Sequence, residues 1–89
     1  MDIGAKEALI RGGKSLLPSG VVSASGVFEG GEVVSLCDPA GEEFARGVAN
    51  YDTEQVERIK GLKSSQIEGV LGAKPFDEVV HRDNLVVLE

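Results

Sequence analysis

The sequence predicts a mainly β domain with short helices, and three observations support this fold class. The chain has 89 residues, which suits one domain. Its twelve glycines exceed the usual share of about 7% and indicate many tight turns. Several short segments alternate between apolar and polar residues, as strands do. With only three Phe, one Tyr and no Trp, the core must consist mainly of Val, Leu, Ile and Ala.

One helix is expected near the N-terminus, at residues 4–12. Ala5, Ala8 and Leu9 follow helical spacing there, and a pair of glycines ends the pattern. A non-helical linker containing a proline and a glycine follows at residues 15–20.

Three antiparallel strands are expected next, because turn-forming residues interrupt the apolar and polar alternation. Gly30-Gly31 suits the two-residue turn of a β-hairpin, in which both central positions can take positive φ. A second turn contains Pro39 and Gly41. The predicted strands are residues 21–29, 32–38 and 42–51.

Two short helices and two final strands are expected in the second half. Asp52 and Gln55 have the spacing of a capping box, and Gly61 ends the helix that follows. Ser65 and Glu68 suggest a second capping box. A helix stop at Gly72, strands at 78–81 and 85–88, and a turn at 82–84 complete the prediction.

The charge of the chain is negative and unevenly distributed. The formal net charge of −6 argues against strong nonspecific binding of nucleic acid, which requires lysines and arginines. Five acids and no base occupy residues 29–43, and we assign them to the solvated surface of a hairpin. Lys6, Arg11 and Lys14 place any anion-attracting surface near the N-terminus.

The sequence predicts a cytoplasmic location and no membrane contact. No apolar run approaches the roughly 20 residues that span a bilayer. An acid follows Met1, where a signal peptide would have basic and then apolar residues. The single cysteine, Cys37, cannot form an intramolecular disulfide, which suits a reducing compartment.

Two motifs resemble catalytic signatures but lack required residues. Residues 13–15 (GKS) resemble the end of a phosphate-binding P-loop, but Ala8 stands where that motif needs glycine. Residues 81–84 (HRDN) resemble the catalytic loop of protein kinases, but Leu88 stands where that loop needs asparagine. We interpret the first as a helix-ending turn and the second as an ordinary turn.

Cys37 and His81, each the only residue of its kind, do not predict a zinc site, because no further ligand has suitable spacing. Cys37 is expected to pack inertly on a strand. A catalytic pair of Cys37 and His81 is an alternative that nothing in the sequence orients. No catalytic, cofactor-binding or metal-binding residue is therefore predicted.

Five motifs occur in a fixed order along the chain: GAKEAL at 4–9, GKSLLPSGV at 13–21, GVFEGGEVV at 26–34, ARGVANY at 45–51 and EVVHRDNLVVL at 78–88. The motifs up to residue 51, in this order and spacing, resemble the PUA domain, named after pseudouridine synthases and archaeosine transglycosylases. The Asn50-Tyr51 junction and the last motif resemble the PUA domain that ends bacterial glutamate 5-kinases.

The resemblance implies one PUA domain over residues 1–89, a pseudo-barrel of mixed, mostly antiparallel strands with short covering helices. It also implies a strand before the first helix, which would be short or truncated here. The parent would be a cytoplasmic kinase that phosphorylates the γ-carboxylate of glutamate with ATP and Mg²⁺, the first step of proline synthesis, under inhibition by proline. The chemistry would belong to an N-terminal amino-acid kinase domain, so this chain would be non-catalytic.

The first functional hypothesis is a regulatory and interaction module that contacts the kinase domain and takes part in a homo-oligomer. Leu16, Leu17 and Pro18 are candidate contacts, because apolar residues in a linker need a partner. The alternative for these three residues is that they plug one end of the barrel. A stand-alone PUA protein with another partner is a further reading of the same features.

The second hypothesis is RNA binding, the role of PUA domains in RNA-modifying enzymes. The first helix and the glycine-rich turn would bring backbone N–H groups and basic side chains to phosphates. The net charge of −6, the expected pairing of Arg11 with Glu7 and the lack of an aromatic stacking platform argue against it. The candidate positions are Gly4, Ala5, Lys6, Arg11, Gly12, Gly13, Lys14 and Ser15.

Overall fold

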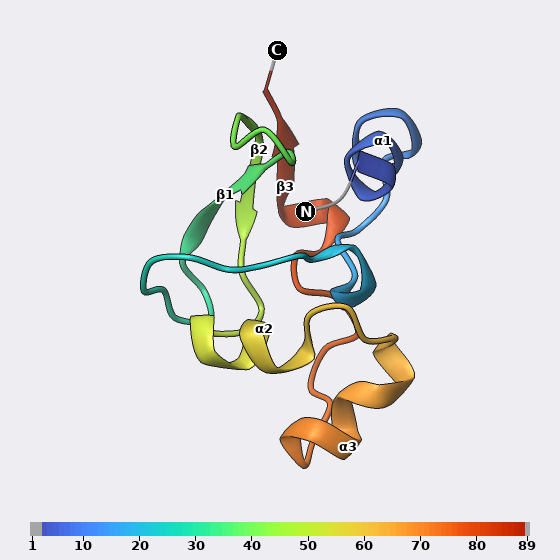
Figure 1. Ribbon diagram of the computed structural model, residues 1–89, viewed down its shortest axis with the longest axis vertical. Coiled ribbons are helices and arrows are strands. Elements are labelled where there is room, and N and C mark those ends of the chain that lie inside the picture. The colour runs from blue at the N-terminus through green and yellow to red at the C-terminus, as the bar shows by residue number, and fades with distance from the viewer. Residues whose placement is uncertain (1–2, 89) are drawn as a thin grey trace.

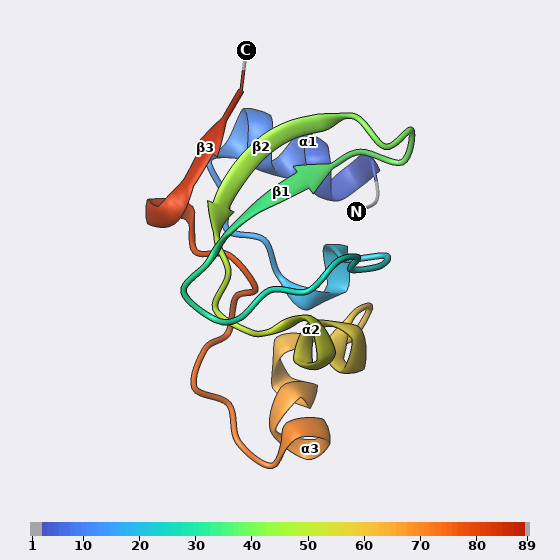
Figure 2. The same cartoon turned by 90° about the vertical axis from the view of Figure 1, so that its left-hand side faces the viewer.

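A computed structural model describes residues 3–88 and shows a small antiparallel sheet with short helices around it (Figure 1). The sheet has the strand order β1-β2-β3. Helix α1 covers one face of the sheet, and α2 and α3 lie together at the other end of the molecule (Figures 1 and 2). The elements are α1 (Ile3–Gly12), η1 (Pro18–Gly20), β1 (Val33–Cys37), β2 (Glu43–Val48), α2 (Thr53–Ile59), η2 (Ser64–Gln66), α3 (Ile67–Leu71), η3 (Arg82–Asn84) and β3 (Leu85–Val87).

A β-bulge in the β1–β2 pair sets how the sheet meets the core. Leu36 is opposite Ala45, but Cys37 is opposite Glu43, so Phe44 has no partner in the ladder. The extra residue turns both Phe44 and Ala45 toward the interior, where both are buried. The remaining core is aliphatic apart from one tyrosine: Leu9, Leu16, Val21, Leu36, Tyr51, Val56, Ile59, Ile67, Val79 and Val80.

The start of α2 follows its sequence signal, whereas the start of α3 does not. Asp52 Oδ1 accepts the Gln55 N–H at 2.8 Å, and Gln55 Oε1 accepts the Asp52 N–H at 2.9 Å, as a capping box requires. The predicted box of Ser65 and Glu68 is wrong. The chain enters that region through η2, and Gln66 Oε1 accepts the N–H of the residue before η2 instead.

The predicted strand at residues 21–29 is wrong, because its backbone groups bind α2 instead of a neighbouring strand. Ala24 N–H donates to Glu57 Oε1 at 2.7 Å, and Phe28 N–H donates to Thr53 Oγ1 at 2.7 Å. Thr53 N–H in turn donates to Phe28 O at 3.1 Å. The predicted glycine turn does form, with Gly31 at φ 94°, but it separates the two chain segments instead of closing a hairpin.

The linker and the C-terminal segment meet in the core. Leu16 N–H donates to Val80 O, and Val79 N–H donates to Leu16 O, each at 2.8 Å. These bonds form an isolated bridge, so the strand predicted at residues 78–81 is reduced to Val80. The second predicted strand forms as β3, and the turn before it is the short helix η3. Within residues 3–88 no helix has the length and apolar character to cross a membrane.

Candidate functional site

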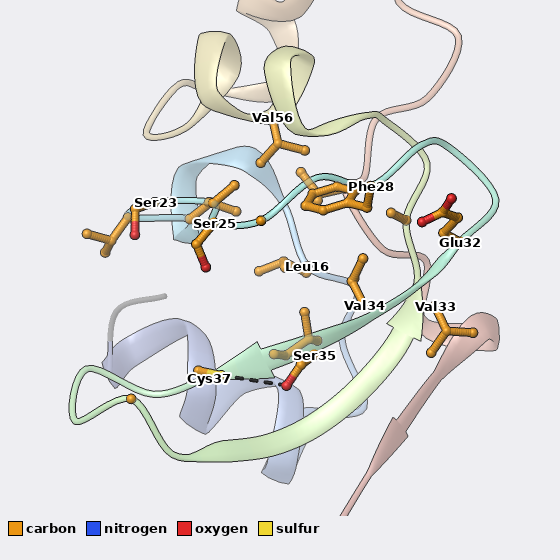
Figure 3. Close-up of a pocket in the computed structure, with 18 of the residues that line it drawn as sticks. Leu16, Ser23, Ser25, Phe28, Glu32, Val33, Val34, Ser35, Cys37 and Val56 are labelled. Atoms are coloured by element: carbon orange, nitrogen blue, oxygen red, sulfur yellow. Dashed lines mark hydrogen bonds between the residues drawn. The ribbon is translucent and has the colours of Figure 1, made fainter.

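A groove of about 900 Å³ lies between β1 and the extended residues 21–28 (Figure 3). It occupies the place where the sequence predicted a paired hairpin. Phe28 forms part of one wall and Val34 part of the other, Leu16 lies between the walls, and Val56 from α2 lines the groove on the side of residues 21–28. Both wall residues are only half-buried, so the groove leaves apolar surface open to solvent.

Both walls of the groove present backbone groups that lack partners in the part of the chain described. On β1, the bonds from Ala49 N–H to Glu32 O and from Asp38 N–H to Glu42 O fix which residues face β2. In an antiparallel ladder the residues between these bonded positions turn their N–H and C=O groups to the opposite edge. For β1 those groups include Val33 and Ser35, and they point into the groove.

The opposite wall is also unpaired over most of its length. Within residues 3–88, the backbone N–H groups of Val22, Ser23 and Ser25 make no hydrogen bond. Gly26, at φ 76°, bends this wall away from a regular strand. The two walls therefore resemble two sheet edges that face each other across an apolar floor.

The chemistry of the groove suits the binding of an extended segment. Its polar side chains include Ser35 and Cys37, whose Oγ and Sγ atoms are 3.6 Å apart, with either atom able to donate. Among residues 3–88 no group of three or more His, Cys, Asp and Glu side chains is arranged to hold a metal ion. An apolar floor between exposed backbone edges is the arrangement that binds an extended segment by strand addition.

Only some of the residues predicted to form an RNA or partner surface lie together around one hollow. A shallow hollow of about 360 Å³ lies beside α1 and the glycine-rich turn after it. Its lining includes Ala5, Lys14, Ser15, Leu16 and Leu17 from the predicted set. The other predicted residues, which do not line the hollow, are Gly4, Lys6, Arg11, Gly12, Gly13 and Pro18.

Two of the three bases in this region are bound to acids. Lys6 Nζ lies 3.0 Å from Asp38 Oδ2 and 5.4 Å from the centroid of the Phe44 ring. The hydrogen bond from Lys6 lowers the pKa of the Asp38 carboxyl, with further help from backbone N–H groups. Arg11 Nε lies 2.8 Å from Glu7 Oε2, as the sequence predicted. In the described part of the chain only Lys14, of these three bases, has no ion pair.

The apolar linker residues divide between core and surface. Leu16 is 3% exposed, and Pro18 is buried with its carbonyl accepting the Gly61 N–H at 2.7 Å. These positions favour the alternative in which the linker closes one end of the fold. Leu17 is 43% exposed and is the one of the three whose side chain is available to a partner.

Comparison with protein families gives a match to the PUA domain over residues 1–71, most of the chain. The chain belongs to the PUA domain family. The three-stranded sheet with short covering helices fits the mainly β pseudo-barrel expected of this family, with shorter strands than the sequence suggested.

The PUA domain is also similar along its whole length to part of several glutamate 5-kinases. It is 55% identical over 89 residues to the glutamate 5-kinase of Caldanaerobacter subterraneus subsp. tengcongensis, covering all of this chain and 24% of that protein. It is 53% identical to the Moorella thermoacetica enzyme, covering 99% of this chain and 23% of that protein. The Dictyoglomus thermophilum enzyme is 49% identical, with coverage of 99% and 24%. The chain thus spans about a quarter of the length of these relatives.

The groove of this PUA domain was missed by sequence reasoning, which paired its two walls with each other. One signal was present: Ser23, Ser25 and Gly26 fall within the predicted strand, and serine and glycine are common in turns. The decisive contacts, from Thr53 and Glu57 to that segment, depend on tertiary structure and leave no local pattern.

Proposed function

We propose that this PUA domain is the regulatory and interaction domain at the C-terminal end of a glutamate 5-kinase and is itself non-catalytic. The observation that carries the proposal is the 55% identity over the entire chain to a protein of which it covers 24%. The ATP, Mg²⁺ and glutamate of that reaction would bind an N-terminal amino-acid kinase domain in the same chain. A cytoplasmic location and a role in proline synthesis follow from this assignment.

The outer face of the sheet supports a docking role. Val33 and Val86 are 68% and 64% exposed, and the strand register places both on the same face as Arg46. Arg46 Nε lies 2.9 Å from Glu43 Oε2, and this bond lowers the pKa of Glu43 and raises that of Arg46. Apolar residues around a charged pair resemble the mixed surfaces by which domains of one chain contact each other.

Deletion of residues 1–89 from the intact enzyme tests the proposal. We expect phosphoryl transfer to glutamate to persist, because the catalytic groups lie elsewhere, and we expect proline inhibition, Mg²⁺ dependence or oligomer size to change. Initial rates over a proline series and light scattering measure these quantities. If all three properties stay as in the intact enzyme, the regulatory role is wrong.

A pair of point variants distinguishes the loss of a contact at the outer sheet face from a nonspecific effect of added charge. Val86→Lys places a charge on the outer sheet face, and we expect it to weaken proline inhibition or assembly. Ser65→Lys adds the same charge at an exposed position in η2, next to α3 at the far end of the molecule, and should leave both unchanged (Figure 1). Equal effects from the two variants would argue against a contact at the sheet face.

RNA binding is the second candidate, because Lys14 has no ion pair within residues 3–88 and lies beside the hollow next to the glycine-rich turn. The net charge of −6 and the acids bound to Lys6 and Arg11 weaken this candidate. Titration of the protein with a structured RNA at about 50 mM salt tests it, since phosphate contacts are strong at low salt. A complex that Lys14→Glu abolishes would favour RNA binding, and no complex at that salt concentration would end the idea.

A further inference from the structure

We propose that His81 is a pH-sensitive switch at the entry to β3. Its neutral ring holds η3 in place, and protonation of the ring releases that short helix. Because β3 carries Val86 on the outer sheet face, the switch regulates docking through that face. Only this last step rests on the proposed function, since the switch itself is a property of the fold.

The first argument is the hydrogen bond that begins η3. His81 Nδ1 accepts the Asp83 N–H at 3.1 Å, and the His81 carbonyl accepts the Asn84 N–H at 2.9 Å. A ring nitrogen accepts a hydrogen bond only while it carries no proton, so the proton of the neutral ring lies on Nε2. The side chain therefore caps η3 as an asparagine or aspartate does, but only in its neutral form.

The second argument is that two carboxylates flank the same ring. Asp83 Oδ2 lies 3.5 Å from Nδ1, and Glu78 Oε2 lies 3.9 Å from Nε2. In the neutral state the Asp83 carboxylate faces a nitrogen lone pair, which repels it, and in the protonated state it faces an N–H donor. Protonation therefore replaces the bond to the backbone of Asp83 with a bond to its side chain, between about pH 8 and about pH 5, where histidine ordinarily changes charge.

The charges on the neighbouring segments leave both carboxylates to the ring. The linker packed against this segment contributes Lys14 and Ser15, and Ser15 Oγ accepts the Arg82 N–H at 2.8 Å. Within residues 3–88 neither Lys14 nor Arg82 forms an ion pair with the two acids beside the ring. The base of β2, Arg46, is bound to Glu43 instead. The two acids therefore remain free to stabilise the protonated ring.

The third argument is the tight contact between η3 and the sheet. Asn84 O, at the end of η3, is so near β2 that a Cβ added to Gly47 would lie 2.9 Å from it. β3 has only three residues, and its first pair with β2 is Gly47 with Leu85. A shift of η3 therefore acts directly on this pair. We expect β3 to separate from β2 at that end and to move Val86 out of the outer sheet face.

Hydrogen exchange followed by mass spectrometry on the full-length enzyme tests the switch, at about pH 7.5 and about pH 5.5. In His81→Asn the amide oxygen can cap η3 but does not titrate. We compare the native enzyme with this variant at the same pH, which removes the direct effect of pH on exchange. For a peptide covering residues 82–88, the native-to-variant ratio of exchange should be near one at the higher pH and about threefold or more at the lower pH. A peptide covering α2 is the control and should keep a ratio near one.

Asp83→Asn is the second variant. It keeps the backbone N–H that the neutral ring accepts, and it removes the carboxylate that the protonated ring needs. The rise in exchange should therefore move to lower pH. This variant decides the matter if His81→Asn loosens the segment already at the higher pH, and a rise at an unchanged pH would then overturn the switch.

Two further results would overturn it. One is a ratio near one at both pH values, and the other is an equal rise in the peptide from α2, which would indicate general unfolding in acid. Proline inhibition of the native enzyme and of His81→Asn, measured at the same two pH values, reports the regulatory step separately. A rise in exchange with no difference in inhibition would overturn that step alone, so the switch and the proposed function can fail independently.

Discussion

Lys6 and Asp38 join the first helix to the end of the first strand across 32 positions of sequence, with Nζ and Oδ2 3.0 Å apart. Asp38 also closes the β1–β2 turn, because its Oδ1 accepts the N–H groups of Ala40 and Glu42, each at 3.0 Å. One carboxylate therefore holds the hairpin turn and anchors α1 over the sheet.

This relationship predicts a loss of stability in acid. The hydrogen bond from Lys6 is the main cause that lowers the pKa of Asp38 below its ordinary value of about 4. A carboxyl whose pKa is depressed by folding stabilises the fold above its unfolded pKa, and this contribution disappears as the pH falls through the folded pKa. We expect the melting temperature of the native protein to drop between about pH 5 and about pH 2. Circular dichroism melts measure it.

Asp38→Asn provides the comparison for that pH series. The variant should melt lower than the native protein at pH 7 and should lose less on acidification, because one of the responsible carboxyls is gone. The pKa of Glu57 is lowered as well, mainly by a hydrogen bond from Lys60 and further by the Ala24 N–H, so Glu57→Gln should remove a separate part of the acid effect. A native pH slope in Asp38→Asn would show that Asp38 contributes nothing.

Tyr51 holds the segment around Phe76 in place, and its hydroxyl should contribute to the stability of the fold. The residue is 1% exposed, its hydroxyl donates to Phe76 O at 2.5 Å, and it accepts the Phe76 N–H at 3.2 Å. Tyr51→Phe removes both hydrogen bonds and leaves the N–H and C=O groups of Phe76 without the hydroxyl as a partner. We expect a loss of about 1–3 kcal/mol in the free energy of unfolding, measured with urea.

Phe76→Leu separates the hydroxyl from the ring contact. The Tyr51 and Phe76 rings meet edge to face, with centroids 5.9 Å apart, and the leucine variant loses this contact but keeps both backbone bonds. Its expected effect is about 0.5–1.5 kcal/mol. If Tyr51→Phe proved no more harmful than a neutral surface change, the two hydrogen bonds would not matter for stability.

Most local signals in the sequence predicted local structure, although the capping box expected at Ser65 and Glu68 did not form. The three-residue spacing of Asp52 and Gln55 predicted the capping box that begins α2, and the helical spacing of residues 4–12 predicted α1. The i,i+4 spacing of Glu7 and Arg11 likewise predicted their ion pair. In each case the groups that interact lie within one helical turn, so the sequence contains the whole interaction.

Contacts between distant segments could not be predicted in this way. Residues 21–29 have a strand-like pattern, but Thr53 and Glu57 bind their backbone groups. No residue close to Phe28 in the sequence indicates these contacts. Leu16 looked like a linker residue because its partner, Val80, lies near the other end of the chain. The groove exists because the turn at Gly31 separates two segments that the alternation alone would have paired.

Gly47 offers the strictest test of the packing, because the structure leaves no room for a side chain there. A Cβ at this position in β2 would lie 2.4 Å from Val80 Cγ1 and 2.9 Å from the Asn84 carbonyl oxygen. Val80 is fully buried and Asn84 O belongs to the backbone before β3, so neither atom can withdraw without moving its segment. We expect Gly47→Ala to destabilise the protein by about 1–3 kcal/mol in urea unfolding.

Gly69 is the matched control, because a Cβ there meets no atom of residues 3–88 within 4 Å. It lies in α3, where alanine is favoured over glycine by about 1 kcal/mol, so Gly69→Ala should stabilise the domain slightly. The two changes add the same methyl group and should differ in sign. A neutral or stabilising Gly47→Ala would mean that β2 is not held against Val80 and η3, and the placement of the C-terminal segment across the core would then be wrong.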